Sequence, residues 1–370
     1  MRLVYFSPVH ARSYAQRPHY TVQAWLDLGA ESVLWVDPYP CRLPRWGDLR
    51  RRPLLNNQET RLDPRITVLE VPALPIEPLP AGAWFNRRFL WGPVGRQIAR
   101  FAGHGPTILG IGRPSALALA VLDQWRPAAT FYEAMDNFPE FHSGLSRRSV
   151  RHYEDLISAR ADLIVASSTF LAEKFARRGR RVEKVVNAYA MSTLPEYDSP
   201  DSSERRPVLG FIGCLGKWID WPLMVRLARS FPEAAIELVG PCAVPPPQDL
   251  PANIRLLPPC PQQEAGNHLA RFSVGLIPFL KTPLTAGMDP IKYYEYHAMG
   301  LPMLSTSFGE MVYRGSQDGV YFLDSGEDLA VVVRRASAHR FSPADVAAFR
   351  SQNDWQVRFR STAPFRQLVS

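Results

Sequence analysis

A lysine and a glutamate stand one helical turn apart in the segment DPIKYYEYHAMGLPM, residues 289–303. Pro290 suits the first turn of a helix and Ile291 continues it, while a glycine and a proline follow at its end. Lys292 and Glu295 then share one face beside backbone N–H groups that attract anions. This lysine could neutralise a diphosphate, and this glutamate could accept hydrogen bonds from a ribose diol. The alternative is an exposed ion pair worth about 0.2–0.5 kcal/mol.

Three carboxylates crowd the segment TFYEAMDNFPEFH, residues 130–142, at the end of an expected strand: Glu133, Asp136 and Glu140. A carboxylate placed there can take the proton of a hydroxyl group as its oxygen attacks another atom, which is general base catalysis. Because loop aspartates often cap the turn that follows them, Asp136 could instead have a structural role. We expect at least one of the three to face a cleft between two domains.

Basic side chains also follow the first expected strand, in the segment SPVHARSYAQRPHY, residues 7–20. His10 lies in the loop, and Arg17 and His19 lie at the start of the helix that follows it. His10 is an alternative general base. Because an arginine before a helix is often only a solvated side chain, a binding role for Arg17 stays open.

Arginines alternate with aromatic residues in AWFNRRFLWGPVGRQIARF, residues 83–101, and no acid intervenes. Basic and aromatic side chains together suit a helix that lies in the plane of a membrane surface. The pattern predicts such a contact through Trp84, Arg87, Arg88 and Trp91. A core-packing helix with a solvated basic face is the alternative. Nucleic-acid binding is disfavoured because no recognised motif accompanies the charge.

The candidate site residues lie in a sequence that alternates short β-rich runs with segments of helical spacing. This alternation is typical of βαβ units, which form a parallel sheet. The alternation lapses once, in a polar stretch rich in proline and serine. We therefore predict an α/β fold of two Rossmann-like, doubly wound domains facing a cleft. The predicted divisions are a first domain 1–190, a linker 191–207, a second domain 208–340, and C-terminal helices 341–370 that pack back toward the first domain. Ligands bind such sheets beyond the carboxyl ends of the strands.

The string Pro290-x-Lys292-x-x-Glu295-Tyr-x-Ala-x-Gly-x-Pro resembles the donor-binding motif of nucleotide-sugar glycosyltransferases with the GT-B architecture. The resemblance covers most of the second domain and extends to the run VLGFIGCLGKWIDW. It implies that Lys292 contacts the donor phosphates and Glu295 the ribose, beside Pro290 and Ile291. By the same resemblance, Gly213 allows the backbone to approach the sugar diphosphate closely.

The segment around Asp136 resembles a stretch of bacterial exopolysaccharide and teichuronic-type transferases in which the aspartate is the general base. The loop with His10, Arg17 and His19 resembles the acceptor or phosphate loop of the same enzymes. Many retaining members of the class carry another glutamate eight residues before the ribose-binding one, where this chain has Gly287. We therefore expect an inverting mechanism.

The composition narrows the class of protein. The chain has 370 residues, of which 46% are hydrophobic and 21% charged, which excludes disorder as the main state. The net charge is +8, and the excess lies in residues 1–190, with 26 basic and 17 acidic side chains. This excess favours an anionic partner.

Apolar runs are too short to span a bilayer, and the first residues lack the pattern of a secretory signal, so we expect a cytoplasmic protein. The sequence contains no DxD motif and no CxxC pair of cysteines, so nothing in it indicates a metal site. We expect neither a metal nor another cofactor.

These observations predict a metal-independent glycosyltransferase that moves a sugar from a nucleoside-diphosphate sugar, by preference a UDP-sugar, to a membrane-presented acceptor. A lipid-linked saccharide of a surface polysaccharide would suit the basic first domain, with an anionic membrane surface as a further partner. Two alternatives remain open. One is a nucleotide-sugar epimerase, and the other is a non-catalytic protein that binds a nucleotide sugar.

Overall fold

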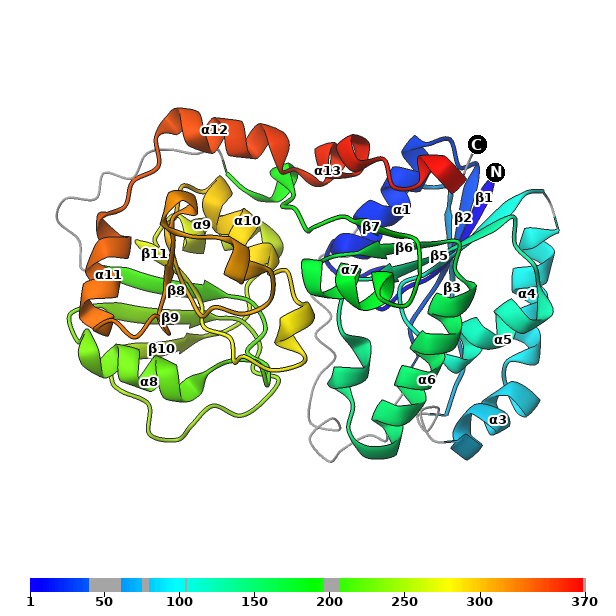
Figure 1. The fold of residues 1–370 in the computed structure, drawn as a ribbon, viewed down its shortest axis with the longest axis horizontal. Helices are drawn as coiled ribbons and strands as arrows, with labels where there is room; N and C mark the ends of the chain where they lie inside the picture. Colours follow the sequence, from blue (N-terminus) through cyan, green and yellow to red (C-terminus); the bar gives the residue numbers. More distant parts are fainter. Residues whose placement is uncertain (40–60, 75–79, 104, 196–206, 369–370) are drawn as a thin grey trace. The chain divides into compact units, whose positions relative to one another are not determined.

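The computed structural model describes residues 1–39, 61–74, 80–103, 105–195 and 207–368. The chain forms two compact units, Met1–Val186 with Phe359–Ser370 and Asn187–Arg358 (Figure 1). The chain therefore passes from one unit to the other twice, the second time within helix α13, Trp355–Thr362. Of the predicted linker 191–207, residues 196–206 lie outside the described part of the chain.

The first unit is built on a 7-stranded parallel sheet with the order β3-β2-β1-β4-β5-β6-β7. Its strands are β1 Arg2–Phe6, β2 Ser32–Val36, β3 Ile66–Leu69, β4 Thr107–Ile111, β5 Ala129–Ala134, β6 Leu163–Ala166 and β7 Val182–Lys184. Its helices are α1 Arg17–Asp27, α3 Pro80–Phe89, α4 Gly92–Ala102, α5 Ala116–Gln124, α6 Gly144–Arg160 and α7 Thr169–Ala176, with the 3-10 turn η1 Phe138–Phe141. The predicted strands are confirmed here, and only the short, charged β7 had no clear sequence signal.

Successive side chains of β1 pack on opposite faces of this sheet, as the period of two in a strand requires. Val4 and Phe6 belong to a core cluster with Trp91 and Ile98, and Figure 1 shows α4, α5 and α6 along this part of the unit. On the other face, the Trp25 ring of α1 lies 5.6 Å from that of Phe131 in β5 and 4.9 Å from that of Phe365, between ring centroids. The end of the chain thus completes the core of the first unit.

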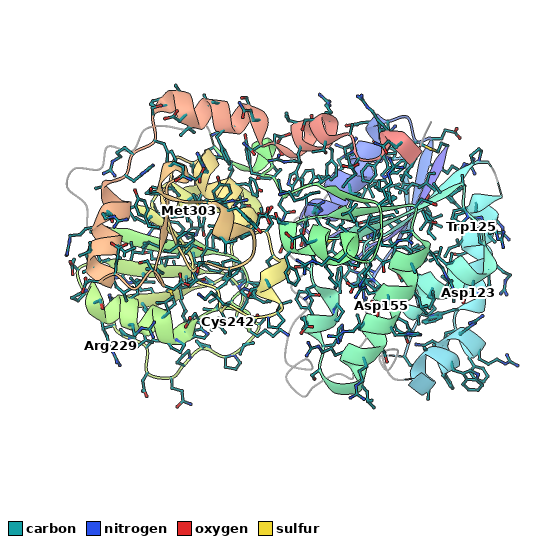
Figure 2. All side chains as sticks on the ribbon, in the orientation of Figure 1. Asp123, Trp125, Asp155, Arg229, Cys242 and Met303 are labelled. Carbon is teal, nitrogen blue, oxygen red and sulfur yellow. The ribbon has the colours of Figure 1, made fainter. Side chains whose placement is uncertain are left out.

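The second unit has a 6-stranded parallel sheet with the order β10-β9-β8-β11-β12-β13. Its strands are β8 Val208–Ile212, β9 Ala235–Val239, β10 Ile254–Leu257, β11 Val274–Ile277, β12 Met303–Ser305 and β13 Val320–Phe322. Its helices are α8 Trp221–Ser230, α9 Gln262–Leu269, α10 Ile291–Ala298, α11 Leu329–Ala338 and α12 Pro343–Gln352, with 3-10 turns η2 Met191–Thr193, η3 Thr285–Gly287, η4 Gly309–Tyr313 and η5 Ser316–Asp318. A last turn, η6 Arg366–Leu368, belongs to the first unit. Side chains fill the space between sheet and helices, where Met303 is fully buried (Figure 2).

The C-terminal stretch 341–370 is divided between the two units. Helix α12 packs on α10 of the second unit, where the Phe349 ring stacks on His297 with centroids 3.8 Å apart. Residues 359–370 belong to the first unit. The chain that enters the second unit also belongs to it from residue 187, because Tyr189 pairs with Asp354 in an isolated β-bridge.

Both sheets reverse their strand order once, between β1 and β4 and between β8 and β11. In open parallel sheets, ligands bind outside the carboxyl ends of the strands at such a switch point. The loops that follow β1, β4, β8 and β11 border these switch points, and the loop after β5 follows the next strand of the first sheet. Among the described residues, no helix is both long and apolar enough to cross a membrane.

Candidate functional site

Helix α10, Ile291–Ala298, lies within one residue of its predicted bounds at each end. Pro290 is the N-cap, with extended backbone angles, and Ile291 is the first helical residue. At the other end, Gly300 has a φ of 63°, a left-handed conformation that glycine adopts without strain. The first turn contains no acidic residue, and the N-cap contributes no side-chain hydrogen bond. The Tyr293 N–H donates to the Pro290 carbonyl over 3.0 Å, whereas no backbone or side-chain acceptor within the described residues binds the N–H groups of Ile291 and Lys292, which can therefore meet a ligand or water.

Lys292 and Glu295 form an ion pair at the start of α10, with Nζ donating to Oε2 over 2.8 Å. Their side chains are 23% and 21% exposed, so the pair is reachable from solvent. Gly213 follows β8 across the switch point, with a φ of 147°. A Cβ added to Gly213 would lie 3.1 Å from Lys292 Cε, so the missing side chain lets the backbone approach the lysine. The structure thus brings three of the predicted donor residues together.

A buried cluster under the start of α10 was not identified from the sequence. Asp289 is 5% exposed, and its carboxylate accepts hydrogen bonds from the Asn187 backbone N–H at 2.6 Å and the Tyr294 hydroxyl at 2.9 Å. The Arg314 guanidinium also donates to it, over 3.0 Å. Burial raises the pKa of Asp289, and the Arg314 charge opposes that rise. Asp289 directly precedes Pro290, but no sequence spacing links it to Arg314 or Asn187.

In the first unit, Glu133 at the end of β5 is fully buried. Its carboxylate accepts hydrogen bonds from Arg17 Nε at 2.8 Å, the Thr21 hydroxyl at 2.7 Å and the Tyr5 hydroxyl at 2.6 Å. Arg17 is only 3% exposed and also donates to the Val185 carbonyl over 2.7 Å. Arg17 is predicted to lie in an acceptor or phosphate loop, whereas in the structure it is buried as the partner of Glu133.

The two histidines of the same loop differ in their surroundings. His19 holds the loop to α1, since Nδ1 accepts from the Gln16 N–H and Nε2 bonds the Ala11 carbonyl. Burial lowers the pKa of His19. His10 is exposed and lies 3.2 Å from Asp37, the residue that follows β2. The hydrogen bond to Asp37 raises the pKa of His10. His10 therefore remains accessible to a ligand, and His19 has a structural role.

Asp136 lies in the loop between β5 and η1 and is half-buried. Burial raises its pKa to about 7, and the Arg17 charge opposes that rise. Within the described residues, its carboxylate makes no hydrogen bond and no ion pair, and the N-cap of η1 is Asn137, not Asp136. The capping role that the sequence leaves open is therefore not seen. An unpaired carboxylate with a pKa near neutrality has the proton affinity that a general base needs.

The neighbouring polar residues of this loop already have partners. Asn137 accepts a hydrogen bond from Lys174 at 3.0 Å, and Glu140 accepts one from Arg147 at 2.5 Å. Of the three carboxylates that crowd this segment, Glu133 is buried in its cluster and Glu140 is bound to arginines. Asp136 alone among the three has no partner in the described part of the chain.

Helix α3 carries an exposed aromatic and basic surface. Trp84 is 64% exposed and Phe89 55%, and Arg87 and Arg88 are exposed beside them. The prediction that Trp91 shares this surface is wrong, because Trp91 is 4% exposed and belongs to the core cluster. The reason is that α3 ends at Phe89 and α4 starts at Gly92, so Trp91 lies in the turn between them and points inward.

No group of three or more histidine, cysteine, aspartate or glutamate side chains in the described part of the chain could hold a metal ion. Cys214, Cys242 and Cys260 are free thiols. Burial raises the pKa of Cys260, which keeps that thiol protonated.

A sequence comparison with known proteins finds a glycosyltransferase among the relatives of this chain. The sequence is 25% identical over 184 residues to the "Putative teichuronic acid biosynthesis glycosyltransferase TuaH" of Bacillus subtilis (strain 168), a match that covers 45% of this chain and 45% of that protein. The chain thus matches less than half of the length of this relative. No protein-family model matches the sequence.

Solved structures are similar over nearly the whole chain. Sucrose-phosphate synthase from Thermosynechococcus elongatus has a TM-score of 0.70 at 13% identity, covering 100% of this chain and 99% of that one. "Trehalose-6-phosphate from E. coli bound with UDP-2-fluoro glucose" has a TM-score of 0.62 at 13% identity, covering 98% of both chains. At such low identity these similarities establish the fold. Together with the curated relative, they confirm the predicted resemblance to GT-B glycosyltransferases.

Proposed function

We propose that this chain, whose fold is that of the GT-B glycosyltransferases, transfers a sugar from a UDP-sugar to a lipid-linked saccharide acceptor presented at a membrane. The transfer inverts the anomeric centre and needs no metal. The protein acts in the cytoplasm, at the inner face of the cell membrane, in the synthesis of a surface polysaccharide. Similarity to a teichuronic acid biosynthesis glycosyltransferase supports the surface-polysaccharide assignment.

The observation that carries this proposal is the accessible Lys292–Glu295 pair beside Gly213 at the switch point of the second sheet. A bound nucleotide would replace the Lys292–Glu295 ion pair with two contacts, one from each side chain to the nucleotide. Lys292 turns to the diphosphate, which the N–H groups of α10 also favour, and Glu295 accepts hydrogen bonds from the ribose hydroxyls. A similar fold in complex with UDP-2-fluoro glucose supports uridine as the base.

In the chemical step, the acceptor hydroxyl oxygen forms a bond to the anomeric carbon while the bond from that carbon to the diphosphate oxygen breaks. Asp136 takes the hydroxyl proton, and UDP leaves with the electron pair. Lys292 and the N-terminal turn of α10 stabilise the charge that develops on the leaving diphosphate, which is the role that a metal ion has in other transferases. The raised pKa of Asp136 and its lack of a partner support this assignment.

Membrane contact is proposed for the α3 surface, defined by Trp84, Phe85, Arg87, Arg88 and Phe89. These exposed aromatic and basic side chains suit the interface of an anionic bilayer. The Phe85 and Phe89 rings lie 4.7 Å apart, so the apolar part of the surface is continuous.

Release of UDP from candidate UDP-sugars tests the proposal against its alternatives. A glycosyltransferase releases UDP at a rate that rises with a membrane-extracted acceptor, and EDTA leaves this rate unchanged. An epimerase would convert the sugar with no release of UDP, and a binding protein would do neither. Loss of turnover in EDTA, restored by a divalent ion, would contradict the metal-independent mechanism.

A further inference from the structure

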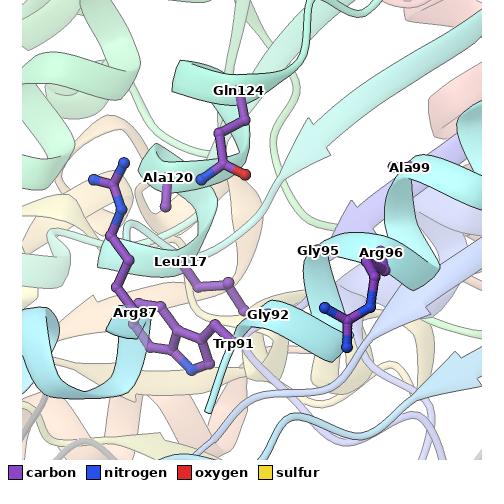
Figure 3. Close-up of a pocket in the computed structure, with 9 residues that line it drawn as sticks. All are labelled: Arg87, Trp91, Gly92, Gly95, Arg96, Ala99, Leu117, Ala120 and Gln124. Carbon is purple, nitrogen blue, oxygen red and sulfur yellow. The ribbon is translucent and has the colours of Figure 1, made fainter. Parts of the chain in front are cut away.

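A pocket of about 250 Å³ lies in the first unit between α3, α4 and α5 (Figure 3). Its lining includes Arg87, Trp91, Gly92, Gly95 and Arg96. Neither Asp136 nor the donor residues contribute to it. Pockets for whole small molecules usually measure about 300–1,000 Å³. This one has the size for a polar headgroup.

Two arginines of this pocket have no acidic partner. Arg87 of α3 and Arg96 of α4 are both exposed, and in the described part of the chain neither guanidinium makes an ion pair or a hydrogen bond. The adjacent Arg88 differs, since its guanidinium lies over the Phe89 ring at 5.3 Å. Figure 3 shows Arg87 and Arg96 on opposite sides of Trp91. The pocket therefore has a positive charge at each of two sides.

The start of α4 adds to this positive potential. Arg96 Nη1 lies 3.6 Å from the position that a Cβ on Gly92 would take, so the guanidinium lies over the first turn of the helix. A cation beside the positive end of a helix dipole is unfavourable, and the first turn contains no acid. A bound anion would offset both the Arg96 charge and the positive end of this helix.

We propose that the pocket binds the phosphate of a membrane lipid whose headgroup is a phosphate monoester or a diphosphate. Two guanidinium groups and a helix start match a doubly charged phosphate better than the singly charged phosphodiester of most phospholipids. A lipid is the source because Arg87 joins the pocket to the exposed aromatic side chains of the α3 surface, which suit acyl chains. This inference rests on the proposed membrane contact and adds a specific lipid site to it.

A soluble lipid probe tests the pocket without a membrane. Dihexanoyl phosphatidic acid, below its micelle concentration, is titrated calorimetrically into the full chain. Gly95→Leu fills the pocket, since a Cβ at Gly95 would meet nothing within 4 Å, and Arg96→Gln removes one charge. We expect each to weaken binding roughly 10-fold or more. Gln97→Leu and Arg100→Gln are matched controls on exposed positions of α4 outside the pocket, and they should bind as the wild type does.

Vesicle flotation then separates the pocket from the membrane contact. At equal surface charge, the wild type should prefer phosphatidic acid to phosphatidylglycerol, and Gly95→Leu should lose the preference but keep the general binding. Probe binding that is unchanged in both pocket variants would overturn the proposal. Inorganic phosphate that binds as tightly as the lipid probe, without any vesicle preference, would overturn the lipid assignment. Probe binding without any vesicle binding would support the pocket and contradict the membrane contact.

Discussion

Two ion pairs, one in each unit, have the same length and differ in their burial. Arg17–Glu133 and Lys292–Glu295 both join a residue at the start of a helix to a carboxylate, and each has an N–O distance of 2.8 Å. The side chains of the first pair are 4% and 0% exposed, whereas those of the second are 23% and 21% exposed. Burial therefore separates an ion pair that supports the fold from one that a ligand can open.

The number of further contacts explains this difference. Glu133 has two hydroxyl donors besides Arg17, and Arg17 also bonds a backbone carbonyl. Opening this pair would leave a charge in the interior, at a cost of several kcal/mol. Lys292 and Glu295 share a single hydrogen bond in a partly solvated place, which is worth about 1 kcal/mol or less. In the proposed donor complex, a diphosphate and a ribose replace this hydrogen bond.

The largest expected effect is on stability. Arg17→Leu should lower the free energy of unfolding by about 3–5 kcal/mol, because it leaves Glu133 buried without its counter-charge. Lys292→Leu, the matched change in the other pair, should lower it by less than about 1 kcal/mol. Urea unfolding of both variants measures these values. If both variants lost the same free energy of unfolding, the two ion pairs would not differ in their contribution to the fold.

The next effect is on the rate of transfer. Asp136→Asn keeps the size of the side chain but removes the proton acceptor, so kcat should fall by roughly 10² to 10⁴ while UDP affinity stays the same. Glu140→Gln, in the same loop but bound to arginines, is the control and should keep most of the activity. The product should have the anomeric configuration opposite to that of the donor. A fully active Asp136→Asn enzyme, or a product with the donor's configuration, would contradict the mechanism.

A smaller effect concerns stability against pH. The folded pKa of Asp136 is about 7, against about 3.9 in an unfolded chain. Between these values the folded state holds a proton that the unfolded state has released, so this group lowers stability as pH rises. Asp136→Asn does not titrate. Its stability relative to the wild type should therefore rise by on the order of 1–3 kcal/mol from pH 4.5 to pH 8, since one pKa unit equals about 1.4 kcal/mol. A difference that does not depend on pH would show that Asp136 is solvated.

The smallest effect concerns the α3 surface. Each arginine near an anionic bilayer contributes about 1 kcal/mol, and salt weakens this attraction. Arg88→Gln should therefore reduce binding to anionic vesicles roughly fivefold at low salt, and Trp84→Ser should reduce it at all salt concentrations. Arg148→Gln, on α6, is a control of equal charge. Binding to neutral vesicles as strong as to anionic ones would argue against an electrostatic contact.

Local patterns in the sequence predicted the strands and the donor helix because both depend on neighbouring residues. The proline and glycine signals at the two ends of α10, Pro290 and Gly300, are examples. Contacts between distant residues could not be predicted in this way. Arg17 meets Glu133 across 116 positions, and Asp289 meets Asn187 across 102. Trp91 was assigned to the surface because the sequence does not show that one helix ends and another begins around it.

Calorimetric titration of uridine, UMP and UDP into the wild type, Lys292→Ala and Glu295→Ala tests the donor site most directly. If the exposed pair opens to hold a nucleotide, Glu295→Ala should weaken all three ligands, because all contain the ribose. Lys292→Ala should weaken UDP roughly 10-fold or more and leave uridine unchanged, because only the phosphates contact the lysine. Affinities that are the same in both variants and the wild type, for all three ligands, would show that this pair is an ordinary surface ion pair and that the donor binds elsewhere.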